Sequence, residues 1–286
     1  MVPVGYLEYA WSLFFKKDQS ETKLLIDPKL KQPTLSRDKV GFAIVLPEPT
    51  MREEEAISFL GYQFPAEPLG KLQVTKLFKA CVFHLSAHVA TSDFEVYSKW
   101  EEQKDNRLAK FSESLVEDVK VNAYILTGYP DKLVDIAFAN SLAFKRSKSL
   151  GRIWNPATRV MAASLLQANL GAAKGDVRTE ERKTVSQVVD KLGQLKDKVL
   201  ESFAGEQVNL DDLGLKVADE IYHALERYGP VLEVPSLPHT EQLGHCTLFP
   251  QCQVQPDDDD VDVFNRCLTA LGGEASRGEL QQTMQV

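Results

Sequence analysis

Two histidines, His84 and His88, lie four positions apart in an apolar stretch with helical spacing. Side chains at positions i and i+4 share one helix face. Both imidazoles can therefore reach one ion, as in the H-E-x-x-H zinc motif, where the Glu is the general base. Leu85 stands at the position of that Glu. The pair thus predicts metal binding, and the missing base favours a binding or maturation role over a peptidase.

A carboxylate partner for this pair is predicted on a second helix. On a helical wheel of residues 107–127, Asp118 falls inside the apolar arc and Glu117 falls opposite it, toward solvent. A buried carboxylate is costly unless it is paired, hydrogen-bonded or metal-bound. We therefore predict a site for zinc or another divalent metal made by His84, His88 and Asp118. The alternative is that the same residues form a structural, hydrogen-bonded core cluster.

Other residues of metal-binding type have weaker patterns. Glu220 and His223 form an E-x-x-H half-motif, but a di-iron bundle needs two such motifs and two further Glu residues. His223 also points away from the apolar face of its own helix, so we expect it on the surface. A knuckle of His239, His245, Cys246 and Cys252 lacks the usual zinc spacing. The sequence contains no nucleotide-binding loop and no serine-hydrolase motif.

The composition limits the function classes. The chain has 286 residues, of which 43% are hydrophobic and 26% charged, as in a soluble globular protein. A formal net charge of -8 argues against nucleic acid as the main partner. No apolar run reaches the roughly 18 residues of a membrane span, and the first residues lack signal-peptide features. Four unevenly spaced cysteines suggest reduced thiols, and we expect a cytoplasmic location.

The elements that must position the site are predicted to be helices. The spacing favours a mainly α fold, with a multi-helix, bundle-like body, an irregular Pro-rich N-terminal segment and an extended C-terminal tail. The predicted parts are an N-terminal segment packed on the body (1–70), a helical domain (71–229), a Pro-rich and acidic linker (230–260), and a short helix with a disordered tail (261–286).

Helix boundaries are marked by cap residues. Asn155 followed by Pro156 is typical of a helix start, and Gly229 followed by Pro230 is typical of a helix end. An apolar stripe with polar residues on the other face predicts an amphipathic packing helix; it comprises Val185, Val188, Leu192, Leu195, Val199 and Phe203.

Three segments carry a family resemblance: the histidine pair, Leu115–Asn122 and Val217–Tyr222. Together they resemble the N-terminal helical region of von Willebrand factor A proteins of the nitric-oxide-reductase activation and cobaltochelatase-subunit type. The resemblance extends over Leu72 to Leu225. It implies a MoxR-type AAA+ ATPase as partner and a client metalloenzyme that is activated or supplied with its metal cofactor.

The sequence departs from that family's pattern in three places. Leu85 stands where a metallopeptidase-like member has Glu, and Asn122 stands where the second segment often ends in Glu. No Asp-x-Ser-x-Ser motif of a von Willebrand A domain occurs, so we expect either a piece of a longer protein or a helical region that acts alone. The predicted function is an accessory or adaptor module without assigned catalytic residues. The alternatives are a zinc-dependent, metallopeptidase-like hydrolase and a purely structural helical scaffold.

Overall fold

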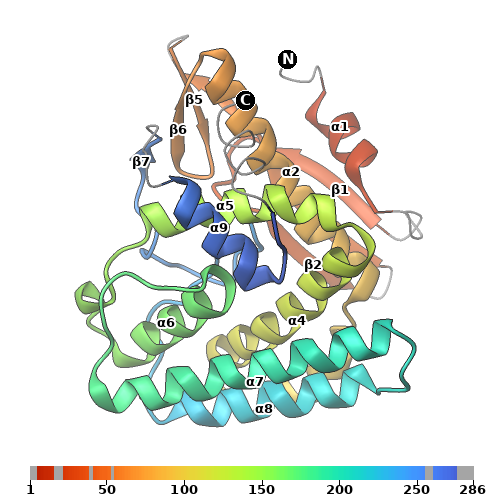
Figure 1. Cartoon of the computed structure of the whole chain (residues 1–286), viewed down its shortest axis with the longest axis vertical. Helices are drawn as coiled ribbons and strands as arrows, with labels where there is room; N and C mark the ends of the chain where they lie inside the picture. Colours follow the sequence, from red (N-terminus) through yellow and green to blue (C-terminus); the bar gives the residue numbers. More distant parts are fainter. Residues whose placement is uncertain (1–4, 16–21, 39–40, 53–54, 255–259, 276–286) are drawn as a thin grey trace.

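The computed structural model describes residues 5–15, 22–38, 41–52, 55–254 and 260–275. Within these ranges the chain is mainly helical, as predicted (Figure 1). The α-helices are α1 (Tyr6–Leu13), α2 (Pro68–Thr91), α3 (Glu95–Glu101), α4 (Asn106–Gly128), α5 (Leu133–Arg146), α6 (Pro156–Leu170), α7 (Thr179–Phe203), α8 (Leu210–Glu226) and α9 (Asp260–Leu271). Short 3₁₀ turns at Pro130–Lys132 and Leu150–Arg152 join some of them.

Helix α2 runs through the centre of the molecule. It packs against α4 and α5, and every residue from position 80 to position 88 is buried. A helix that is apolar nearly all round is expected to be buried, and the two histidines accordingly lie among aliphatic, aromatic and small residues. Pro68 begins the helix, where its missing N–H costs nothing. At Gly70 a Cβ would lie 2.0 Å from the Pro65 carbonyl oxygen, so only glycine fits this turn.

Helices α7 and α8 lie side by side and cover one edge of the body (Figure 1). The predicted apolar stripe of α7 is buried from Val185 to Val199, whereas Phe203 is 38% exposed. Helix α4 packs on both α7 and α8. The side chain of Asp105 accepts hydrogen bonds from the first free N–H groups of α4, which satisfies that helix end. Thus α4 is enclosed between α2 and the outer pair.

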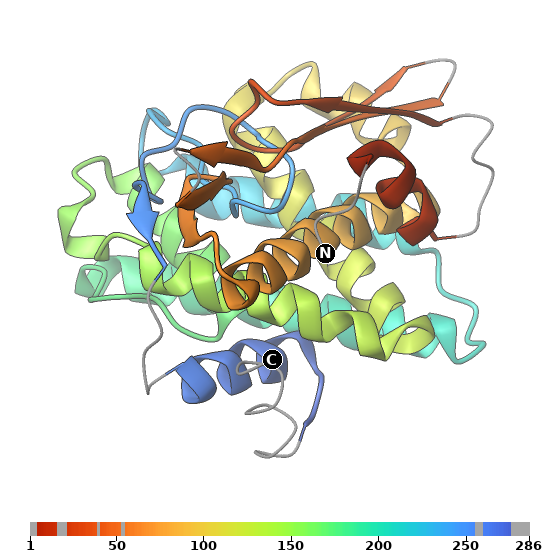
Figure 2. The same ribbon diagram turned by 90° about the horizontal axis from the view of Figure 1, so that it is seen from above.

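The N-terminal part of the chain adds short strands that the proline spacing did not predict. A three-stranded sheet has the order β1-β3-β2, and a four-stranded sheet has the order β4-β5-β6-β7. Figure 2 shows the strands on one face of the helical body and α9 on the opposite face. The strands are β1 (Thr22–Asp27), β2 (Thr34–Asp38), β3 (Gly41–Pro47), β4 (Thr50–Arg52), β5 (Ala56–Phe59), β6 (Tyr62–Pro65) and β7 (Cys252–Gln253).

A tight hairpin joins β5 and β6 and also touches the C-terminal part of the chain. Leu60 and Gly61 both have positive φ angles, 50° and 77°, as a two-residue primed turn requires. Arg146 donates to the carbonyl oxygens of Leu60 and Phe249, each at 2.5 Å. Strand β7 extends the sheet by pairing parallel to β6. Strands β6 and β7, about 190 residues apart in the sequence, are therefore hydrogen-bonded neighbours in this sheet.

The segment from Pro230 to Val254 differs from the linker that its proline content predicted. Several of its side chains are buried against the body, among them Val234, Leu237 and Leu248. Its backbone also bonds to the N-terminal part, since the N–H of Gln242 donates to the Pro33 carbonyl oxygen. The segment lacks regular structure before β7, but it belongs to the folded core.

Several predicted boundaries are confirmed. Asn155 accepts a hydrogen bond from the Thr158 N–H with Pro156 at the first helical position. Gly229 has a φ of 86°, the left-handed conformation expected after a helix. The short C-terminal helix is present as α9. Residues 257–259 of the acidic run and the tail at 276–286 lie outside the described residues.

Among the helices that the structure describes, none combines the length and apolar character needed to cross a membrane.

Candidate metal centre

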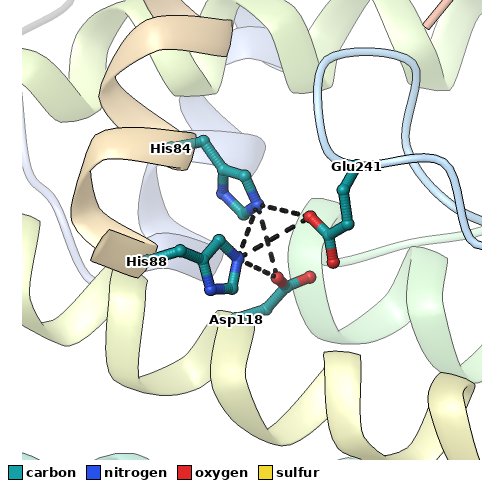
Figure 3. A group of neighbouring side chains, drawn as sticks. All are labelled: His84, His88, Asp118 and Glu241. Atoms are coloured by element: carbon teal, nitrogen blue, oxygen red, sulfur yellow. Dashed lines mark hydrogen bonds and ion pairs between the residues drawn. The ribbon is translucent and has the colours of Figure 1, made fainter. Parts of the chain in front are cut away.

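Four side chains from three parts of the chain meet inside the molecule (Figure 3). His84 and His88 come from one face of α2, and Asp118 comes from the facing side of α4. The fourth residue, Glu241, comes from the segment that follows α8. Two rigid helices thus supply three of the groups, and an irregular but buried segment supplies the last.

The ligand atoms converge on a common point. The two Nε2 atoms of the histidines are 3.1 Å apart. Asp118 Oδ1 lies 3.5 Å from each of them, and Glu241 Oε2 lies 3.3 Å from His84 Nε2 and 3.7 Å from His88 Nε2. Nitrogen and oxygen ligands at the usual zinc distance form a tetrahedron with edges of about 3.3 Å. These five separations are close to that edge length, and all four ligand atoms lie within 4.8 Å of one another, so one ion can lie between them.

The cluster is buried and short of positive charge. The exposed fractions are 2% for His84, 0% for His88, 4% for Asp118 and 9% for Glu241. Asp118 Oδ1 makes no hydrogen bond within the described part of the chain, although it faces both histidines. A buried carboxylate oxygen without a donor is costly. A divalent cation between these groups would satisfy that oxygen and balance both carboxylates, so the donor set fits a metal ion.

The pKa shifts express the same electrostatic coupling. Burial opposes protonation of His88, but Asp118 and Glu241 outweigh burial and raise the pKa of this imidazole. Burial disfavours the Glu241 carboxylate, yet the two histidines overcome this effect and lower its pKa to about 2. For Asp118, burial dominates and raises the pKa. The electrostatics of the cluster thus favour positive charge among these groups, which a proton or a metal ion can supply.

Outer contacts fix the orientation of two of the ligands. His88 Nδ1 lies 2.8 Å from Ser92 Oγ. With its Nδ1–H donated to that hydroxyl, His88 presents the Nε2 lone pair to the centre. The Ser114 hydroxyl donates to Glu241 Oε1 at 2.9 Å, which leaves Oε2 directed at the histidines. Such contacts are typical of the outer shell of metal sites.

The segment that carries Glu241 is itself held by hydrogen bonds. The Gln32 side chain donates to Ser236 Oγ at 2.8 Å and to the Leu237 carbonyl oxygen at 2.7 Å. These contacts place Glu241 relative to the N-terminal strands as well as the helices. The centre therefore joins three regions that are remote in sequence.

The structure brings the three predicted residues, His84, His88 and Asp118, together. The expectation for Glu117 was wrong: its exposed fraction is 0%, and its Oε1 accepts from the Tyr97 hydroxyl at 2.7 Å and pairs with Lys120 Nζ at 2.8 Å. The outward face of α4 is covered by α3 and α8, so its polar residues are buried too.

The other candidates lie away from this centre. His223 is on the surface, as predicted, with its side chain 55% exposed beside Asp219 and Glu226. Glu220 pairs with Lys191. Cys246 Sγ accepts from the Leu248 N–H. Among the described residues, the histidines and cysteines of this knuckle do not come together as a metal site.

Glu241 is the member of this group that the sequence did not reveal. It lies between Pro238 and Pro250 in a stretch without helical or strand periodicity, so no spacing rule relates it to the histidines. Leu85 stands where an H-E-x-x-H motif has Glu, and Glu241 supplies a carboxylate beside His84 and His88 from another part of the chain. Its neighbour His239 is also buried, with a ring centroid 6.2 Å from that of His84, and burial lowers the pKa of His239 to about 3.

In comparisons with protein families, curated proteins and solved structures, the chain matched none. The feature of the chain that points to a function is the buried group of His84, His88, Asp118 and Glu241, which could hold a metal ion.

Proposed function

We propose that the chain is a helical module that binds one divalent metal ion, with zinc as the best fit, through His84, His88, Asp118 and Glu241. The observation that carries the proposal is the convergence of all four ligand atoms within 4.8 Å of one another in a buried site. Zinc accepts nitrogen and oxygen ligands in tetrahedral geometry. The set contains no thiolate, the ligand that selects softer metals, and so it does not favour them over zinc.

A role in holding metal is favoured over catalysis. Four protein ligands fill a tetrahedron, as in structural zinc sites, whereas catalytic sites keep one position for water or substrate. In line with the family resemblance, we propose that the module is an accessory or adaptor protein. It would act with a MoxR-type AAA+ ATPase in the activation or metal-cofactor maturation of a partner enzyme.

A zinc-dependent hydrolase is the second candidate, and Glu241 is the observation that favours it. If only His84, His88 and Asp118 bind the ion, the fourth position takes a water molecule, and Glu241 stands beside it as general base. The Ser114 hydroxyl, which donates to Glu241 Oε1, would then hold that base in place.

Metal analysis of the purified protein after incubation with zinc tests the proposal. We expect one zinc per chain, and we expect the double variant His84→Ala with His88→Ala to lose it. His223→Ala is the matched control, since it removes an exposed imidazole outside the centre. If no metal binds and the double variant is as stable as the parent, the metal proposal is wrong and the scaffold alternative stands.

The variant Glu241→Gln distinguishes the two candidates. As a ligand, Glu241 should contribute to affinity, and its replacement should raise the zinc Kd by about 10-fold or more. As a general base it should leave zinc stoichiometry intact and abolish any hydrolysis of ester or peptide substrates. The adaptor role is tested separately, by measuring whether a MoxR-type ATPase co-purifies with the parent chain and is activated by it.

A further inference from the structure

A cavity of about 280 Å³ borders the candidate metal centre at Asp118, and neither histidine lines it. It lies among α4, α6, α7 and α9, and Asp118 belongs both to its wall and to the cluster. Its polar lining also includes Asn122, Asn169, Gln167 and Lys196. Figure 3 shows the second oxygen of Asp118 turned away from the two imidazoles.

The cavity has an outer and an inner end. Gln167 and Gly193 are exposed, and a Cβ added at Gly193 would meet no atom within 4 Å. Leu115 and Leu192 are 2% and 3% exposed, and Asp118 is almost as deeply buried. The mouth therefore lies between α6 and α7, and the metal ligand Asp118 lies toward the inner end.

Lys196 is the cationic group of this wall. Its Nζ lies 3.5 Å from the Ala270 carbonyl oxygen, and no described carboxylate lies within 4.0 Å of it. Burial lowers the pKa of Lys196, since the partly buried ammonium has lost hydration without gaining a close ion pair. An anion placed in the cavity would restore that lost interaction.

We propose that this cavity binds a small hydroxy-carboxylate, with the carboxylate at Lys196 and the hydroxyl at the Asp118 end beside the metal. This inference rests on the proposed metal function for the role of the hydroxyl, which would either approach the ion or donate to Asp118. The Lys196 end of the ligand does not depend on the metal.

The lining favours a carboxylate over a phosphate. Phosphate recognition typically draws on several donors, such as arginines or a helix N-terminus, whereas this wall offers one lysine. Residues Gln167 to Gly171 form the C-terminal end of α6, where the helix dipole is negative and disfavours a strongly charged anion. The volume is at the small end of ligand pockets, which suits a short chain.

Titration calorimetry on the full chain tests the proposal, with and without bound zinc. The probes are ω-hydroxycarboxylates of about three to six carbons, with the matching neutral diols as controls. We expect one length to bind, no diol to bind, and Lys196→Met to weaken binding by about 10-fold or more. Lys183→Met, on an exposed part of α7, removes the same charge outside the cavity and should leave binding unchanged.

A second pair of variants tests the location without changing charge. Gly193→Phe places a ring at the mouth and should block binding, whereas Gln194→Phe adds the same ring to the neighbouring exposed position and should not. The proposal is overturned if no probe binds with a Kd below about 10 mM. It is also overturned if inorganic phosphate binds in preference, or if Lys196→Met and Gly193→Phe both bind as the parent does.

The result is separable from that of the metal proposal. If zinc does not bind but a probe binds in a manner that requires Lys196, the cavity assignment holds and the metal proposal fails. If zinc binds with full stoichiometry and no probe binds, the cavity assignment alone fails.

Discussion

Glu241 Oε2 lies 3.3 Å from His84 Nε2, although the two residues are 157 positions apart in the chain. Within helices α2 and α4 alone, the cluster would have two imidazoles and one carboxylate. The fourth group comes from a segment with no regular structure at that point, held by Ser114 and by contacts to Gln32 and Pro33 between β1 and β2. The charge and the geometry of the candidate centre therefore depend on tertiary packing rather than on a local motif.

We predict that Ser92→Ala weakens zinc binding by about 10-fold. The hydroxyl holds Nδ1 of His88 at 2.8 Å, and without it the imidazole can rotate or change tautomer. A competition titration with a chromophoric chelator would measure the change in zinc Kd. Ser98→Ala is the control, because Ser98 is exposed and bonds only within α3. An unchanged Kd would mean that helix packing alone orients His88.

We predict that Glu113→Gln makes the protein more stable in alkaline solution. Burial, followed by the nearby Glu101 and other acidic groups, raises the pKa of Glu113 from 4.5 to about 10. The folded state thus keeps a proton that the unfolded state releases, so this residue's stabilising contribution is lost as the pH rises from 4.5 to about 10. Glutamine stays neutral and removes that dependence.

Urea unfolding at about pH 6 and about pH 9 would measure the effect, with an expected gain of roughly 1–3 kcal/mol at the higher pH. Glu117→Gln, one helical turn away, is the contrasting variant. Glu117 pairs with Lys120 and accepts from Tyr97, so its neutralisation should destabilise the protein at both pH values. Equal responses of the two variants would contradict the assignment of a protonated Glu113.

We predict that Arg159→Met costs about 3 kcal/mol or more of unfolding free energy. The guanidinium of Arg159 pairs with Glu181 in a site where both side chains are at most 5% exposed. Removal of the arginine leaves a buried, unpaired carboxylate. The double variant Arg159→Met with Glu181→Gln should recover at least about 1 kcal/mol, because no net charge then remains buried. Thermal or chemical unfolding of the parent, the two single variants Arg159→Met and Glu181→Gln, and the double variant would show the non-additivity, and strict additivity would exclude a coupled pair.

We predict opposite effects for alanine at two helical glycines. At Gly70 the new methyl group would lie 2.0 Å from the Pro65 carbonyl oxygen, so backbone must move and stability should fall by about 1–3 kcal/mol. At Gly193 the methyl group meets open space, and Gly193→Ala should stabilise α7 by about 0.5–1 kcal/mol. Differences in Tm between the variants and the parent would measure both effects.

We predict that removal of the metal loosens the segment that carries Glu241. With zinc bound, this segment is fixed by a coordinate bond as well as by hydrogen bonds. A chelator should therefore increase hydrogen exchange at the amide of Gln242, which donates to Pro33, more than at amides in the middle of α7. The His223→Ala variant should respond as the parent does. If the chelator left the exchange rate of the Gln242 amide unchanged, the ion would not be what holds this segment.

The three site residues on α2 and α4 could be predicted from the sequence because the pattern within each helix is local. The spacing of His84 and His88 and the position of Asp118 within an apolar arc are properties of single helices. Glu117 was misplaced because a wheel describes one helix and assumes solvent on its polar side, whereas α3 and α8 cover that side of α4. The hydrogen bond from Tyr97 and the ion pair with Lys120 make the burial of Glu117 tolerable.

Glu241 could not be predicted for a different reason. Its position depends on contacts such as those between Gln32 and Ser236, which are 204 residues apart. No periodicity within residues 230–254 encodes these contacts. The short N-terminal strands are a similar case. Strands β1 and β3 are parallel neighbours in the sheet although β2 lies between them in the sequence, so their pairing depends on tertiary packing rather than on a local alternating pattern.

The Gln242–Pro33 and β6–β7 contacts have a consequence for how the protein is made in the cell. A ribosome adds about 5–20 residues each second, and helices α2 to α8 emerge before Glu241 does. Until then the nascent chain contains two imidazoles and one carboxylate of the centre, and its N-terminal strands lack their C-terminal neighbour. Metal capture by all four groups would therefore have to wait until residues 230–254 have been made and have folded against the helices.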